Sequence, residues 1–147
     1  LQQCRAPGPI FLEAESPNIG RVTLPPAIVS AIRSSTATRI TVPLPMRVKW
    51  IRRQYSYFEN ECIDLLFDKI RRLKERVGGK TMDRWLQLCA EGDFETFVGE
   101  ILVQYYDPLY THTSGKADRQ AQQLDIDGSD ASYERAAKQL MEQVGVC

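Results

Sequence analysis

The chain has 147 residues, of which 43% are hydrophobic and 26% are charged, as expected for a single globular domain. Its formal charge is zero, but residues 1–80 carry 14 Lys and Arg against 7 Asp and Glu, whereas residues 81–147 carry 5 against 12. A basic half joined to an acidic half leaves a nucleic-acid partner open.

The sequence excludes a membrane-spanning helix. No apolar run approaches the ~20 residues that cross a bilayer, and the first residues lack the basic-then-apolar order of a secretory signal. We therefore predict no membrane partner, and a location in the cytoplasm or in an organelle interior of bacterial origin.

The first half of the chain alternates strands and helices. The run GPIFLEAES is apolar and ends in acids, which predicts a buried strand. Prolines before the next apolar stretch favour the first turn of a helix. In chain order we predict a strand over 8–16, a turn over 17–20, a helix over 27–35, a strand over 38–45 and a helix over 46–58.

The second half is helical until its last thirty residues. Apolar residues recur at helical spacing through residues 60–77, where Asn60 is a candidate cap. We expect Asp93 to cap a helix that Pro108 ends, and Asp130 to cap the last helix. The further predicted elements are helices over 81–92 and 94–110, a polar loop over 111–120, a strand over 122–128 and a helix over 130–145.

This order of elements is typical of an α/β domain with a helical insertion, predominantly helical in this chain. We assign the insertion to residues 57–112, a loop to 113–121, and the last strand and helix to 122–147. Three strands are few for a parallel sheet, and the first element resembles a middle strand. The sequence therefore indicates the distal half of a larger parallel-sheet domain.

The stretch RVGGKTMDRW contains Gly-Gly-Lys-Thr, the ending of a phosphate-binding loop. Such a loop must join a buried strand to a helix, and its first glycine would fall at Lys74. Because the preceding residues predict a helix, we interpret Gly78 and Gly79 as a turn between two helices.

Four scattered cysteines offer little metal chemistry. Cys4, Cys62, Cys89 and Cys147 form no C-x-x-C pair, and His112 is the one histidine. We predict free thiols in a reducing compartment, with Cys62 and Cys89 as small core residues. We assign His112 no catalytic role.

FLEAESPNIG is the densest candidate site. Acids at the carboxyl end of a strand can hold Mg²⁺ or orient water in phosphate-transferring enzymes. Glu15 and Ser16, with the turn from Asn18 to Gly20, could meet a phosphorylated ligand. The alternative is that Glu13 and Glu15 are solvent-facing acids.

Two basic segments are candidates for RNA binding. In MRVKWIRRQY, cationic side chains are interleaved with aromatic rings, which suits phosphates and unpaired bases. The run KIRRLKERVGGK could follow a phosphate backbone. For each segment the alternative is a solvated helix face. The residues are Arg47, Lys49, Arg52 and Arg53 beside Trp50, Tyr55 and Tyr57, then Lys69, Arg71, Arg72, Lys74, Arg76 and Lys80 opposed by Glu75.

YYDPLYTHT gathers Tyr105, Tyr106 and Tyr110 around Asp107. We favour a structural role, in which these rings pack the helix end onto the sheet and their hydroxyls satisfy buried polar groups.

Three stretches together resemble the C-terminal part of the tRNA 2-selenouridine synthase family: FLEAESPNIGRVTLPPAI, ITVPLPMRVKWIRRQY and GDFETFVGEILVQYYDPLY. The family pattern is an E-x-E-S-x-x-I-G stretch, an R-V-x-x-[LI] helix and a closing Y-Y-D-P-x-Y. The resemblance covers roughly residues 10–112. It implies the distal half of a P-loop-type parallel-sheet domain.

The resemblance also implies an activity for the whole enzyme. An N-terminal rhodanese-like domain and a P-loop domain would convert wobble 2-thiouridine of tRNA to 2-selenouridine through a geranylated intermediate. Selenophosphate and geranyl diphosphate would be substrates, and no cofactor is expected in this chain. The implied phosphate-ligand residues are Glu15, Ser16, Gly20 and Arg47, and the implied tRNA-binding residues are Lys49, Arg52, Arg53, Arg71, Arg72 and Lys74.

The chain departs from the family in what it lacks. None of its cysteines matches the rhodanese motif, and no strand leads into a complete phosphate loop. We expect no catalytic residue here and no activity without an N-terminal rhodanese and P-loop segment, in the same or a separate chain. Two alternatives are an RNA-binding or scaffold subunit derived from this domain, and a nucleotide-dependent enzyme of another P-loop family.

Overall fold

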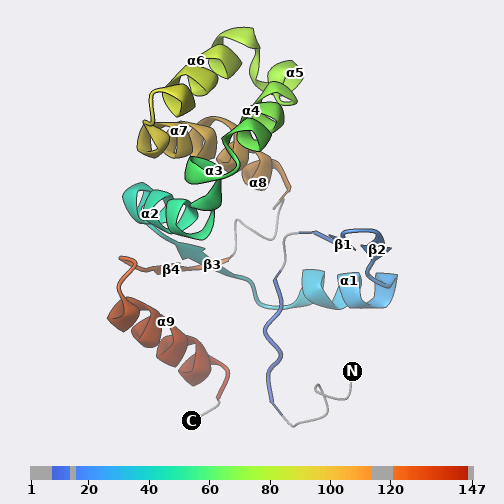
Figure 1. The fold of residues 1–147 in the computed structure, drawn as a ribbon. Helices are drawn as coiled ribbons and strands as arrows, with labels where there is room; N and C mark the ends of the chain where they lie inside the picture. Colours follow the sequence, from blue (N-terminus) through green and yellow to red (C-terminus); the bar gives the residue numbers. More distant parts are fainter. Residues whose placement is uncertain (1–7, 14–15, 114–120, 146–147) are drawn as a thin grey trace. The chain divides into compact units, whose positions relative to one another are not determined.

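The structure, a computed structural model, describes residues 8–13, 16–113 and 121–145 (Figure 1). The chain divides into two compact units. The strand-bearing unit comprises Leu1–Val42 with Thr113–Cys147, and the helical unit comprises Pro43–His112. Within the described residues, no helix combines the length and the apolar character needed to cross a bilayer.

A short parallel sheet lies at the centre of the strand-bearing unit. Strands β3 (Thr38–Thr41) and β4 (Gln122–Asp125) pair with Thr38 opposite Gln122, although 84 positions separate them in the sequence. The Thr41 hydroxyl donates a hydrogen bond to the Asp125 carboxylate. Both strands were predicted, and the fold is mixed α/β and mostly helical. Its P-loop type stays a prediction.

Two helices flank these strands in sequence. Helix α1 (Pro26–Ser34) begins at the predicted proline pair, whose missing N–H groups cost nothing in a first turn. Helix α9 (Asp130–Gln143) follows β4. Its N-cap is Ser129, whose hydroxyl accepts the Ser132 N–H at 3.2 Å, so the cap lies one residue before the predicted Asp130.

The strand predicted over residues 8–16 is wrong for the residues described. Residues 8–13 and Ser16 form no strand, and Ile10, Phe11 and Leu12 are exposed. A strand is stabilised by backbone pairing with a neighbour, no described segment pairs with this one, and Pro9 has no N–H to donate.

An antiparallel hairpin follows instead, where only a turn was predicted. Strands β1 (Asn18–Ile19) and β2 (Val22–Thr23) are joined by two residues, and Gly20 has φ +61°. Positive φ at the first central residue is typical of a tight hairpin turn, and glycine adopts it without steric cost.

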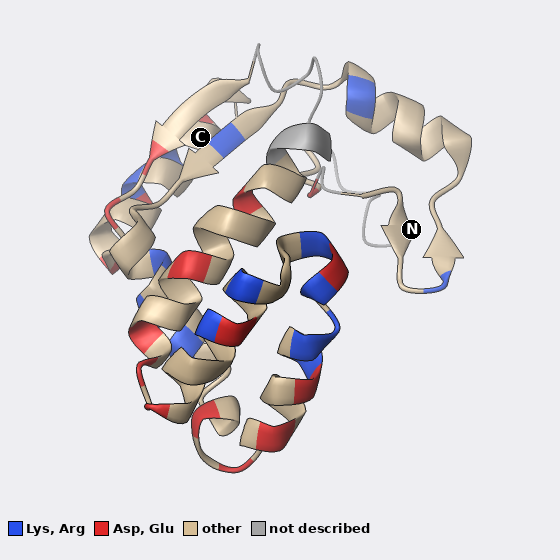
Figure 2. Cartoon of the chain, turned by 90° about the horizontal axis from the view of Figure 1, so that it is seen from above, with Lys and Arg blue, Asp and Glu red and all other residues tan. Residues whose placement is uncertain are grey.

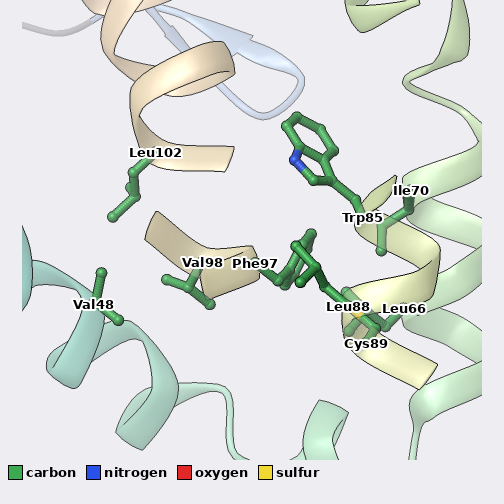
Figure 3. Close-up of a cluster of buried hydrophobic side chains, with 9 residues drawn as sticks. All are labelled: Val48, Leu66, Ile70, Trp85, Leu88, Cys89, Phe97, Val98 and Leu102. Atoms are coloured by element: carbon green, nitrogen blue, oxygen red, sulfur yellow. The ribbon is translucent and has the colours of Figure 1, made fainter. Parts of the chain in front are cut away.

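The helical unit is a bundle of short helices. Its elements are α2 (Leu44–Gln54), α3 (Tyr57–Asn60), α4 (Ile63–Arg71), α5 (Lys74–Val77), α6 (Gly79–Ala90), α7 (Phe94–Ile101), the π-helix η2 (Leu102–Tyr106) and α8 (Asp107–Thr113). Their apolar faces meet in one core, shown in Figure 3, made of Val48, Leu66, Ile70, Trp85, Leu88, Cys89, Phe97, Val98 and Leu102.

Trp85 is the largest side chain of this core and has no exposed surface. Its ring meets Phe97 edge-on, with centroids 6.1 Å apart. The indole N–H donates to the Glu100 carboxylate at 3.1 Å, and the Arg84 guanidinium holds the same carboxylate at 2.6 Å. The one polar atom of the ring is therefore satisfied, as burial requires.

Two predicted helix boundaries are confirmed. Gly78, at φ +83°, lies between α5 and α6, and Gly79 begins α6, so Gly-Gly-Lys-Thr is a helix–helix turn running into a helix, and no strand precedes it. Asp93 caps α7, because its side chain accepts the Thr96 N–H at 3.1 Å.

Two long predicted helices are interrupted. The helix over 46–58 is split into α2 and α3, and the helix over 60–77 into α4 and α5. Asn60 is not a cap: its side chain donates to the Ser56 carbonyl at 2.9 Å, and Cys62 precedes α4. Breaks of this kind let short helices wrap around one core, which periodicity alone cannot reveal.

We had predicted that Pro108 ends a helix, and this prediction is wrong. The chain changes from α-helix to π-helix at Leu102, and the Asp107 N–H donates to the Leu102 carbonyl. This wider turn places Pro108 in the first turn of α8, where its missing N–H is tolerated.

Candidate functional site

An ion pair joins two of the stretches that the sequence singled out. Arg47, in the first half of α2, forks onto the carboxylate of Asp107 at the start of α8, with N–O distances of 3.0 and 2.5 Å. The hydrogen bond to Asp107 raises the pKa of Arg47, and the ion pair reinforces it. Two parallel charge-assisted bonds fix orientation as well as distance. The pair therefore fixes the start of α8 against α2.

The predicted phosphate-ligand residues are not gathered within one unit. Gly20 lies in the turn of the exposed hairpin of the strand-bearing unit, and Ser16 lies two residues before that hairpin, where its hydroxyl accepts the Asn18 N–H at 3.1 Å. Arg47 lies in the helical unit, where an anion would compete with Asp107 for its guanidinium. Glu15 lies outside the described residues. The phosphate-binding role of all four stays a prediction.

Two of the six predicted tRNA-binding residues are held by acids. Arg52 donates to both oxygens of Glu59, at 2.9 and 3.0 Å, and this hydrogen bonding raises the pKa of Arg52. Arg71 pairs with Asp68 at 2.9 Å. Each arginine would have to leave its partner to contact a phosphate. Arg52 joins α2 to α3 through Glu59 and so organises the helical unit, whereas Arg71 and Asp68 form an exposed pair within α4.

The other four are available to a ligand. They are exposed and make no ion pair with any residue that the structure describes. Lys49 and Arg53 lie one turn apart on α2. Arg72 follows the last residue of α4, and Lys74 is the first residue of α5. Figure 2 shows basic residues interleaved with acidic ones along the helices, so charge pairing decides which cations remain available.

The tyrosines of YYDPLY divide into two kinds. Tyr105 is partly buried against the helical core, as a packing role requires. Tyr106 and Tyr110 are 40% and 45% exposed, so their rings are not core residues of the helical unit. The predicted packing of these rings onto the sheet stays a prediction, because the sheet belongs to the other unit. No local pattern marks this difference, because it depends on what lies opposite each ring.

Cys89 does not fit a nucleophilic role. Its side chain is buried, and this burial, assisted by the charge of Glu59, raises the pKa of the thiol to about 12. The thiolate that would attack or bind a metal is therefore scarce at neutral pH. Cys62 and Cys89 are both free thiols, and the described residues contain no group of His, Cys, Asp and Glu that could hold a metal ion.

Comparison with known proteins identifies the family. A family model described as "tRNA 2-selenouridine synthase AAA domain" matches residues 1–143. The chain belongs to this family. The resemblance carried by the E-x-E-S, R-V and Y-Y-D-P stretches is thereby confirmed.

Two curated relatives agree with the family model. The tRNA 2-selenouridine synthase of Shewanella loihica is 28% identical over 136 residues, which cover 75% of this chain and 37% of that protein. The tRNA 2-selenouridine synthase of Marinobacter nauticus is 29% identical over 133 residues, which cover 74% of this chain and 36% of that protein. The chain thus spans little more than a third of these relatives. No solved structure matches it.

Proposed function

We propose that this chain is the C-terminal segment of a tRNA-modifying transferase that converts wobble 2-thiouridine to 2-selenouridine through a geranylated intermediate. The observation that carries this proposal is the family match over residues 1–143. Selenophosphate and geranyl diphosphate would be substrates of the whole enzyme, and this segment would complete its P-loop domain and contribute to tRNA binding.

The strand-bearing unit supports the completing role. Its parallel sheet has two strands in the described residues, so β3 and β4 each have one edge that no described strand pairs. Ile40 of β3 is 54% exposed. Parallel strands are normally buried on both faces, so this sheet has the character of one end of a larger sheet.

The helical unit supports the tRNA-binding role. Lys49, Arg53, Arg72 and Lys74 carry charges that no described acid neutralises, and RNA backbone is bound chiefly by such cations. We assign these four residues to phosphate contact, and Arg52 and Arg71 to supporting the helices that present them.

The test is tRNA binding by the full chain across a salt series, with and without an N-terminal rhodanese and P-loop half from a family member. We expect binding that weakens as salt rises, and conversion of 2-thiouridine only on reconstitution. Arg72→Glu should lower the salt slope by about 0.7–0.9 for each phosphate that the variant no longer neutralises. Arg71→Glu is the matched control, because its charge is already paired. Absence of tRNA binding in both formats would refute the proposal.

A second candidate is an RNA-binding or scaffold subunit derived from this domain. The buried core of the helical unit favours it, because that unit could present its basic residues without the rest of the sheet. In this case tRNA binding by the chain alone would be strong, and reconstitution would yield no conversion.

A further inference from the structure

Five aromatic rings from two distant stretches form a series in the helical unit. Around the end of α2 and in α3, the Tyr57 and Phe58 rings lie 4.5 Å apart, and Tyr55 lies 6.1 Å from Tyr57 and 6.3 Å from Phe58. In η2, about fifty residues later in the sequence, the rings of Tyr105 and Tyr106 meet edge-on at 5.0 Å. We call these five residues the aromatic strip.

Two observations connect the groups. Phe58 and Tyr105 both pack against the same hydrophobic core, so each group has one ring anchored in it. The Arg47–Asp107 ion pair joins α2, whose C-cap is Tyr55, to the residue that follows Tyr106. In agreement with this link, burial raises the pKa of the Tyr106 hydroxyl, and Tyr105 and Tyr55 raise it further.

The strip leaves ring surface open to solvent. Tyr55, Tyr57 and Tyr106 are 43%, 42% and 40% exposed, whereas Phe58 and Tyr105 are partly buried. Aromatic surface clustered on the outside of a domain gains nothing for the core and is typical of binding surfaces. The anchored rings hold the exposed ones in place, which lowers the entropy lost when a ligand stacks on them.

Cations lie on two helices that carry or contact the strip, α2 and α5. Arg53 precedes Tyr55 by two residues, and Lys49 lies one turn earlier on the same helix. The Arg76 guanidinium of α5 reaches the Tyr105 hydroxyl at 3.5 Å, and Lys74 lies on the same short helix.

The acids beside the strip are largely neutralised. Glu59 is held by Arg52 in two hydrogen bonds, and Asp107 is held by Arg47. Glu61 and Glu75 are exposed and make no ion pair with a described residue, but Lys49, Arg53, Lys74 and Arg76, likewise without an acidic partner there, outnumber them and leave a net positive charge. That charge suits a polyanion.

We propose that the aromatic strip stacks unpaired bases of RNA, while Lys49 and Arg53 on α2 and Lys74 and Arg76 on α5 contact its phosphates. This deepens the proposed tRNA binding and rests on it: the preferred partner is a single-stranded loop or end. Duplex bases are stacked on each other and cannot reach a protein ring, whereas unpaired bases stack readily on tyrosine and arginine.

The test compares a fluorescein-labelled single-stranded RNA with a duplex RNA of equal length, using the full chain. We expect tighter binding of the single strand. Tyr55→Ala and Tyr106→Ala should each weaken it by about 5- to 150-fold, the range expected when one base no longer stacks on a ring, and change duplex binding little. Tyr106→Phe should retain affinity, because stacking needs the ring and not the hydroxyl.

Tyr133→Ala is the matched control, because Tyr133 is similarly exposed, at 38%, but lies on α9 of the other unit. Thermal melts monitored by circular dichroism establish whether each variant is folded. If Tyr106→Ala does not fold, Tyr55→Ala alone tests the strip. RNA binding that depends on Lys49 and Arg53 but not on the tyrosines overturns the strip and leaves tRNA binding standing. Equal losses on duplex RNA also overturn it, and failure to bind either RNA overturns both proposals.

Discussion

The two units of this chain use similar apolar residues in opposite ways. The helical unit buries Trp85, Ile70 and seven further side chains in one core. The strand-bearing unit buries Leu124 and Ile126 but leaves Ile10, Phe11, Leu12, Ile19, Val22 and Ile40 exposed. Hydrophobic composition therefore does not decide burial; the presence of a partner surface does.

The physical difference lies in how each element satisfies its backbone. A helix pairs its own N–H and C=O groups and needs a neighbour only for its apolar face, which the adjoining helices supply here. A strand needs a second strand for its hydrogen bonds and a covering layer for its faces. Within the described residues, β3 has one strand partner, β4.

The largest difference should appear when the two units are separated. Residues 43–112 expressed alone should fold and unfold cooperatively, with a stability of about 3–5 kcal/mol, the most that one core of this size supplies. The remainder should show no cooperative transition, because Leu124 and Ile126 are the only hydrophobic side chains that it buries among its described residues. Urea titration followed by circular dichroism measures both transitions. If residues 43–112 are unfolded when expressed alone, the proposed difference between the two units is wrong.

The loss in unfolding free energy should be several-fold larger for a substitution in the helical core than for one in the strand-bearing unit. Trp85→Ala removes the centre of the core and leaves Glu100 without its indole donor, so we expect a loss of about 3–5 kcal/mol in unfolding free energy. Ile40→Ala, at an exposed strand position, should change it by about 0.5 kcal/mol or less. Chemical denaturation of both full-length variants gives the values, and equal losses would contradict a single well-packed core.

Alkaline pH should act on the helical unit through Cys89. Its pKa is raised by burial to about 12, so the folded thiol stays protonated when the unfolded one, with an ordinary pKa of 9.0, has ionised. The stabilisation is complete below about pH 9 and decreases by about 1.4 kcal/mol per pH unit up to about 12.

Denaturation midpoints measured at rising pH should fall more steeply for the native chain than for Cys89→Ala. The variant is less stable at neutral pH because it leaves a small cavity, but it lacks this titration. Parallel pH dependences in the two proteins would show that the thiol is solvated.

The smallest effect on stability is expected from acid pH, which acts on Asp127 just before α9 in the strand-bearing unit. Hydrogen bonds from the Ser129 hydroxyl and N–H lower the pKa of Asp127 to about 2, with help from Ser132 and Arg135. Because this pKa is lowered in the folded chain, the ionised Asp127 carboxylate stabilises the fold above about pH 4, and this stabilisation is lost as the pH falls through about 2. Carboxyl chemical shifts recorded by NMR across this range measure the titration directly, and a pKa near 4 would contradict the capping contact.

Elements that depend on local chemistry could be predicted from the sequence. Helical periodicity, the Asp93 cap and the glycine turn at Gly78 were predicted correctly, because each depends on residues within a few positions. Strands β3 and β4 were also located in the sequence, but their pairing across 84 positions belongs to the folded chain. The family resemblance also followed from short motifs in the right order. The strand over 8–16, the unbroken long helices and the role of Pro108 were wrong, because partners and packing outside each stretch decided them.

The availability of the candidate residues depends on the folded arrangement. Arg52, Arg53, Arg71 and Arg72 are two adjacent pairs of equal charge in the sequence, yet within each pair one arginine is held by an acid and the other is not. Arg47 and Asp107 are 60 positions apart in the sequence, and their ion pair forms only because the folded chain brings α2 beside the start of α8. An ion pair or a ring contact depends on three-dimensional distance, and sequence separation carries no information about distance once the chain folds back on itself.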